Sequence, residues 1–251
     1  MAINIQFLTD AYFTFDKDVP YELKCGKIVW IKPIKVIDSI LFFNSIGVIS
    51  QDKNSIPDPK IIQMSYLDFI INILLHVDTN NGNRLAVILK YCLGMQEPKF
   101  GKDERGKYFL VDTDNDIKIT AKEFEDIRRI ILYQNIYGFD DEYINPELKQ
   151  AMMETDALRH RGIDMPDLER KFAIITAHCG LSKREQIDMT LRSHSALFSE
   201  VCGEVEFETT RAIAMFAGKG KEMEHWIYKK KKNKLDGYIT SIGEYQKMIG
   251  Q

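Results

Sequence analysis

Beyond Thr120, apolar residues recur at steps of three and four positions, the spacing that places side chains on one face of an α-helix. The clearest stripes are Phe124, Ile127 and Ile131; Leu168, Phe172 and Ile175; and Ile187, Leu191, Leu197 and Phe198. Glycines and prolines interrupt the pattern at intervals, which predicts several short helices instead of one long one. We therefore expect residues 119–251 to form a helical region.

Residues 1–118 carry a mixed pattern. β-branched and aromatic runs over residues 3–34 predict strands, with a tight hairpin at the segment CGK, and KYFLV and IKIT predict a second hairpin. Apolar periodicity predicts helices over residues 34–47, 60–77 and 84–93, the last closed by Gly94. The expected fold class is α+β, mainly α: a small N-terminal β-hairpin or sheet with helices, then a C-terminal bundle of short helices. We place a soft domain boundary near residue 118.

Composition excludes several classes of protein. The 251 residues have a net charge of −3, which argues against a general nucleic-acid binder. The four cysteines are widely spaced without a CxxC pair, so we expect neither a zinc site nor a disulfide framework. We also expect no cofactor. The most apolar segment, residues 69–75, is far shorter than the ~20 residues of a membrane helix, and the start lacks the pattern of a secretory signal. We expect no membrane span and no export by that route.

The segment DTDNDIKITAKEF has the spacing of a calcium-binding loop. Its candidate ligands are Asp112, Asp114, Asp116 and Glu123, which match positions 1, 3, 5 and 12 of an EF-hand. Against this, the sixth position is Ile117 and not glycine, and the preceding residues predict a strand and not the entering helix. The preferred interpretation is a solvated hairpin tip, in which Thr120 and Glu123 form a capping box for the next helix.

No arrangement of residues predicts catalysis. The five histidines lie in no HExxH or related context, and the chain has no Gly-rich phosphate-binding motif. His178 and Cys179 are adjacent, but neighbours on a helix point about 100° apart, which disfavours a nucleophile and base pair. For the lysine run at residues 229–234, the preferred interpretation is the favourable interaction of cations with a helix C-terminus, and the alternative is a patch that binds phosphate or an acidic partner. We expect a protein that is not an enzyme.

The apolar helices are then the candidate functional surface, because a helical groove can hold another helix. The candidate contact residues for a helical partner are Phe69, Ile73, Phe198, Phe207, Phe216 and Trp226. The alternative, that these residues belong to the core, stays open at this point.

Several segments of the helical half carry a resemblance. The runs FEDIRRIILYQNI, NPELKQAM, PDLERKFAIITAHCGLSKREQIDMTL and HWIYKKKK resemble tail assembly chaperones of tailed bacteriophages, especially those that infect Gram-positive hosts. The similarity covers about residues 119–235, and its strongest elements include Gln134 and Asn135 after the EFEDIRRIIL helix and the GLSKREQIDMTL segment.

The resemblance implies a non-enzymatic factor of the host cytoplasm. Such a factor binds the long helical tape-measure protein and keeps it soluble until tail-tube subunits polymerise around it. The implied partners are the tape-measure protein, with the tail-tube protein and self-association as further contacts. Two alternatives remain: a structural tail or baseplate component of the virion, and a calcium-binding interaction module.

Overall fold

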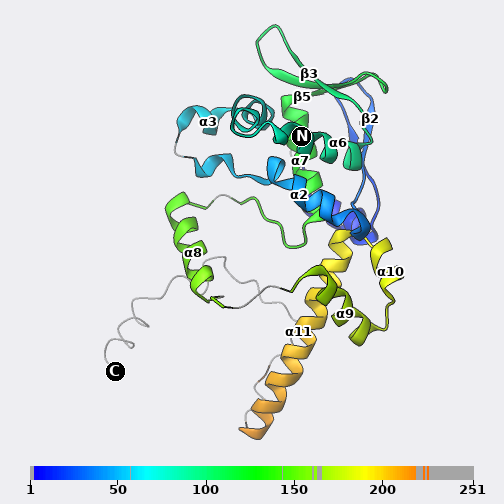
Figure 1. Cartoon of the computed structure of the whole chain (residues 1–251), viewed down its shortest axis with the longest axis vertical. Coiled ribbons are helices and arrows are strands. Elements are labelled where there is room, and N and C mark those ends of the chain that lie inside the picture. The colour runs from blue at the N-terminus through cyan, green and yellow to red at the C-terminus, as the bar shows by residue number, and fades with distance from the viewer. Residues whose placement is uncertain are drawn as a thin grey trace. The chain divides into compact units, whose positions relative to one another are not determined.

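The computed structural model describes residues 3–56, 58–142, 144–159, 161–162, 166–218, 223 and 225 (Figure 1). The chain divides into two compact units, one of residues 1–141 and 172–198 and one of residues 142–171 and 199–251. The expected boundary near residue 118 falls inside the first unit. The reason is that helix α7 (Ala121–Asn135) follows strand β5 (Ile117–Thr120) directly and packs against the strands before it.

Most of the first unit is helical. Its helices and turns are α1 (Ile5–Ala11), η1 (Phe13–Phe15), η2 (Val36–Asp38), α2 (Ser39–Ser50), η3 (Lys53–Ser55), α3 (Pro59–Gln63), α4 (Tyr66–Phe69), the π-helical η4 (Ile70–Leu74), α5 (Leu75–Val77), α6 (Asn80–Leu93), α7 and α10 (Lys183–Asp188). Helices α9 (Leu168–Cys179) and α11 (Leu191–Phe216) have residues in both units, and α8 (Pro146–Arg159) belongs to the second. At 26 residues, α11 is longer than the short helices expected.

Two small antiparallel sheets complete the first unit. Strands β1 (Val19–Glu22) and β2 (Ile28–Ile31) form the hairpin predicted around CGK. Strands β3 (Pro98–Lys102), β4 (Tyr108–Asp112) and β5 form a sheet in the order β3-β4-β5, which adds one strand to the predicted second hairpin. The predicted class, α+β and mainly α with a small β element, is therefore confirmed.

Three local predictions were wrong. Residues 5–11 form a helix and not a strand, because the Asn4 side chain accepts the Phe7 N–H at 3.0 Å and so caps the first turn. The helix expected to end at Gly47 begins at Ser39 and continues to Ser50. The helix expected over residues 60–77 is broken after α3, where Ser65 caps a new helix that passes through a π-helical turn.

Helix α7 lies at the centre of the first unit and packs against α1, α4, β2, β4 and β5. The predicted stripe of Phe124, Ile127 and Ile131 is buried. The predicted capping box is present: the Glu123 N–H is held by Thr120, and the Glu123 carboxylate accepts the Thr120 N–H at 2.8 Å. Within the described ranges, no helix is both long and apolar enough to cross a membrane.

Candidate functional site

The six predicted contact residues do not form one surface. Phe69 is fully buried in the core, so the structure removes it from the candidate contact set. Ile73 and Phe198 are half-buried in the first unit. In the second unit, the half-buried Phe207 ring lies 4.7 Å from that of His225, between centroids, and Phe216 is 95% exposed. Trp226, the sixth, lies outside the described residues, as does the lysine run.

The carboxylates of the candidate calcium loop make contacts within the fold. Asp112 is buried and accepts hydrogen bonds from the turn that follows it, including the Asp114 N–H at 3.2 Å. Asp116 pairs with Lys27 at 2.6 Å, and the hydrogen bond and charge of Lys27 lower the pKa of this carboxyl. Glu123 caps α7, as the hairpin interpretation predicted. No group of three His, Cys, Asp or Glu side chains in the described part of the chain could hold a metal ion.

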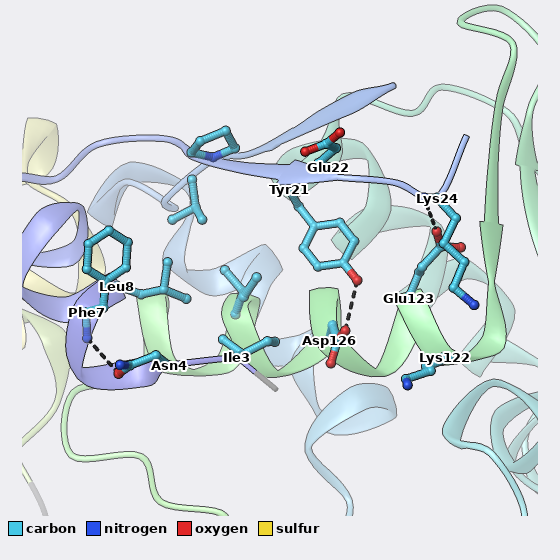
Figure 2. A pocket seen from close by; sticks show the side chains of 13 residues that line it. Ile3, Asn4, Phe7, Leu8, Tyr21, Glu22, Lys24, Lys122, Glu123 and Asp126 are labelled. Atoms are coloured by element: carbon cyan, nitrogen blue, oxygen red, sulfur yellow. Dashed lines mark hydrogen bonds between the residues drawn. The ribbon is translucent and has the colours of Figure 1, made fainter. Parts of the chain in front are cut away.

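A groove of about 330 Å³ lies between α1, β1 and α7 (Figure 2). At its polar end the Tyr21 hydroxyl donates to Asp126 at 2.9 Å, and the Lys24 N–H donates to Glu123 at 2.8 Å. Burial first, and then Asp126, raise the pKa of Tyr21, so the phenol keeps its proton and its hydrogen bond. These polar groups join β1 to α7 and are not a nucleophile beside a base. The other end is apolar, with the half-exposed Phe7 at its rim.

A different surface has the properties of a partner-binding site. Ile37 in η2 is 63% exposed, and Ile40, Leu41 and Phe43 in α2 are 68%, 48% and 54% exposed. We call these four residues the α2 face. A Cβ added at Gly47, one turn beyond Phe43, would meet no atom within 4 Å, so the surface stays unobstructed there. Contiguous exposed apolar side chains are typical of interaction sites.

The residues of the α2 face are not among the contact residues predicted from the sequence. The run SILFF carries apolar residues on all sides of the helix, and this pattern usually indicates burial on all sides. In the structure only one side of α2 is covered.

The opposite side of α2 anchors it. Phe42, Ile46 and Ile49 are buried, and α2 packs against α6 (Figure 1). At the C-terminal turn the Arg128 guanidinium of α7 donates to the Ile49 carbonyl at 2.9 Å and stacks on the Tyr66 ring, 3.9 Å from its centroid. A cation at this end satisfies carbonyls that lack a partner within the helix. The α2 face is therefore held in a fixed position and needs little ordering on binding.

Other exposed apolar side chains are less favourable for binding. Ile28 and Trp30 alternate with buried residues on β2, which presents two exposed apolar side chains. Ile213, Met215 and Phe216 lie at the end of α11. Only the α2 face combines four exposed apolar residues with a helix buried along its other side, within the described ranges.

Comparison of the chain with protein-family models, curated proteins and solved structures finds no match in any of the three. The site must therefore be interpreted from its own chemistry.

His178 and Cys179, the adjacent pair noted in the sequence, lie exposed at the end of α9.

Gln134 and Asn135, which carry part of the family resemblance, have a clear structural role. The Asn135 Oδ1 accepts the Ile34 N–H at 2.6 Å, and the Gln134 Nε2 donates to the carbonyls of Lys17 and Ile31, each at 3.2 Å. These bonds hold the segments on both sides of the first hairpin against α7.

Gln186, in the GLSKREQIDMTL segment, joins three helices. Its buried side-chain amide donates to Thr176 Oγ1 at 2.9 Å and to the Leu181 carbonyl at 3.0 Å, and its oxygen lies 3.2 Å from the His194 ring nitrogen. Buried amides must be satisfied in this way to avoid a desolvation cost. The segment thus positions α9, α10 and the start of α11.

Proposed function

We propose that this protein is a non-enzymatic tail assembly chaperone of a tailed bacteriophage. It binds the helical tape-measure protein in the host cytoplasm through the α2 face and releases it when tail-tube subunits polymerise. The observation that carries this proposal is the exposed apolar stripe of the α2 face. It lies on a helix whose opposite side packs against α6. The family resemblance of residues 119–235 supports the identity of the partner.

The size of the α2 face suits a reversible contact. Burying an apolar side chain completely contributes about 1.5–3 kcal/mol, and the four side chains are roughly half to two-thirds exposed. Covering them contributes about 3–7 kcal/mol before the cost of association is subtracted. A single contact of this strength is weak, and many copies bound along one long helical partner give high total occupancy. Each copy can still be displaced separately by a growing tube.

The chemistry of the partner follows from that of the face. The α2 face has no charged side chain, so it fits an apolar stripe on a helix, with leucine-like side chains at steps of three and four. Such a stripe is what makes an isolated long helix prone to aggregate.

The test is co-expression of the tagged full chain with the products of its neighbouring genes, among which we expect a long helical protein, followed by affinity capture and mass spectrometry. We expect the long protein in the soluble fraction, bound to many copies of this chain. The variant Ile40→Asp/Phe43→Asp should lose both capture and solubility. The matched control Val77→Asp alters a side chain that is 79% exposed on α5, away from the face, and should retain both.

Two results would contradict the proposal. Capture of tube or baseplate proteins alone, together with stoichiometric presence in purified particles, would make this chain a structural tail component. Equal capture of the long protein by both aspartate variants would move the binding site away from α2.

A further inference from the structure

A second cavity of the first unit is lined by lysines. It has a volume of about 600 Å³ and lies where β4, β5 and the start of α7 meet the segments around residues 24, 53 and 64. We call it the lysine groove; its five lysines are Lys24, Lys53, Lys107, Lys118 and Lys122. Within the described residues, none of the five forms an ion pair with a carboxylate.

Around the lysine groove, Asp52 and Glu125 attract Lys53 and Glu123 attracts Lys24, but lysines outnumber carboxylates in its lining. Its lining includes two carboxylates, Asp103 and Glu125. Glu125 is paired with Arg128 at 2.8 Å, and Asp103 accepts the backbone N–H groups of Arg105 and Lys107 at 3.0 and 2.8 Å. Five ammonium groups around one cavity repel one another, in a chain whose net charge is −3. An anionic occupant would remove that repulsion.

The aromatic residues of the groove favour carboxylates over nucleic acid as the occupant. The Lys118 ammonium lies 3.9 Å from the centroid of the Phe109 ring, and the Lys102 ammonium lies 4.5 Å from that of Tyr108. Proteins that bind single-stranded nucleic acid without reading its sequence use aromatic faces on which bases stack. Here a lysine lies over a face of each ring, where a base would otherwise stack.

The same chain carries an exposed acidic segment of matching charge. Glu204, Glu206 and Glu208 lie exposed on α11, in the second unit, and none has an ion pair among the described residues. Glu204 and Glu208 are four positions apart, so they are neighbours on the helix surface, where like charges repel each other. Val205 beside them is 40% exposed, which adds an apolar contact.

We propose that the lysine groove of one copy binds the acidic segment 204–208 of α11 of a second copy. The contact joins two different surfaces, so it is heterologous and links copies head to tail, in a ring or an open row. This contact between copies needs no other protein, so its test is independent of whether the chain binds a tape-measure protein. A row of copies would present its α2 faces repeatedly to a long partner.

The test measures the mass of the purified full chain by sedimentation velocity, from 50 to 500 mM NaCl. We expect association at low salt that weakens as salt is raised, because screening shortens the reach of exposed charges. The groove variant Lys107→Glu/Lys122→Glu and the segment variant Glu204→Lys/Glu208→Lys should each associate about tenfold or more weakly. A mixture of the two variants should associate again, because the acidic segment of the first and the lysine groove of the second are both intact.

Two matched variants complete the design. Lys90→Glu/Lys99→Glu makes the same change in net charge outside the groove and should associate like the wild type. Ile40→Asp/Phe43→Asp, which tests the α2 face, should also self-associate normally. A wild-type chain that is monomeric at low salt and high concentration overturns the proposal, as does a mixture that fails to associate. Binding of a single-stranded oligonucleotide that the groove variant abolishes would instead make nucleic acid the occupant and would equally overturn it.

Discussion

Truncating two side chains of the α2 face should weaken partner binding without unfolding the protein. Ile40 and Phe43 are 68% and 54% exposed, and covering these fractions contributes roughly 2–4 kcal/mol. Alanine keeps one methyl group, so Ile40→Ala/Phe43→Ala should lose about 1.5–3 kcal/mol of binding free energy. At 1.4 kcal/mol for each factor of ten, this corresponds to about 10- to 100-fold in the dissociation constant.

The free protein should remain stable in this variant. Both side chains are largely exposed, and alanine has a higher helix propensity than isoleucine or phenylalanine. We expect the free energy of unfolding to change by less than about 1 kcal/mol. Phe42→Ala, one residue before Phe43 but 2% exposed, should instead lose about 3–5 kcal/mol of stability, which separates the two sides of the helix.

The assay is biolayer interferometry with the co-expressed helical partner immobilised and each variant in solution, alongside urea denaturation of the free proteins. Val77→Ala serves as a matched control, because Val77 is exposed on a different helix. A dissociation constant of Ile40→Ala/Phe43→Ala equal to that of the wild type, with both proteins folded, would refute the assignment of the α2 face.

Three further predictions concern the fold and the candidate calcium site. Phe69→Ala should lower the free energy of unfolding by about 3–5 kcal/mol, whereas Phe216→Ala should change it by less than about 0.5 kcal/mol; similar losses in urea denaturation would contradict their different burial. Burial tends to raise the pKa of Glu123, but hydrogen bonds from the Lys24 and Thr120 N–H groups hold it below the ordinary value of 4.5. Its stabilising effect is therefore present above about pH 4.5 and is lost as the pH falls through the folded-state pKa, so Glu123→Gln should show a smaller loss of stability between pH 7 and pH 3 than the wild type. Millimolar calcium should produce no binding heat in calorimetry, and a saturable heat would restore the calcium-module interpretation.

Signals that lie within a few residues of one another were sufficient to predict much of the fold. Gly94 ends α6 with a positive φ of 75°, as expected of a glycine after a helix. Thr120 and Glu123 form the expected capping box, and the CGK turn joins β1 to β2. Each of these features depends on local backbone geometry, which is determined by the types of a few neighbouring residues.

Features that depend on distant parts of the chain were not predictable in this way. Residues 5–11 match a strand pattern, yet they form α1, which is capped by Asn4 and packs on α7 far along the chain. Residue 118, near which the boundary is expected, lies inside the first unit, in which α7 is central and to which residues 172–198 also belong.

The candidate site shows the same limit. Phe69 was selected because its segment has few charges, and the fold buries it completely. Ile37, Ile40 and Leu41 belong to the apolar periodicity that predicts the helix over residues 34–47, and such a stripe usually faces the core. Which side of α2 stays exposed is decided by its packing against α6, and that is a tertiary contact.

The most direct test of the central claim is carbene footprinting of the full chain, alone and in complex with its co-expressed helical partner. A photoreactive carbene labels exposed side chains, and mass spectrometry locates the label. We predict that Ile37, Ile40, Leu41 and Phe43 are labelled in the free protein and protected in the complex, while Val77 is labelled equally in both. Labelling of the α2 face that does not change on binding, with protection at another surface, would contradict the account.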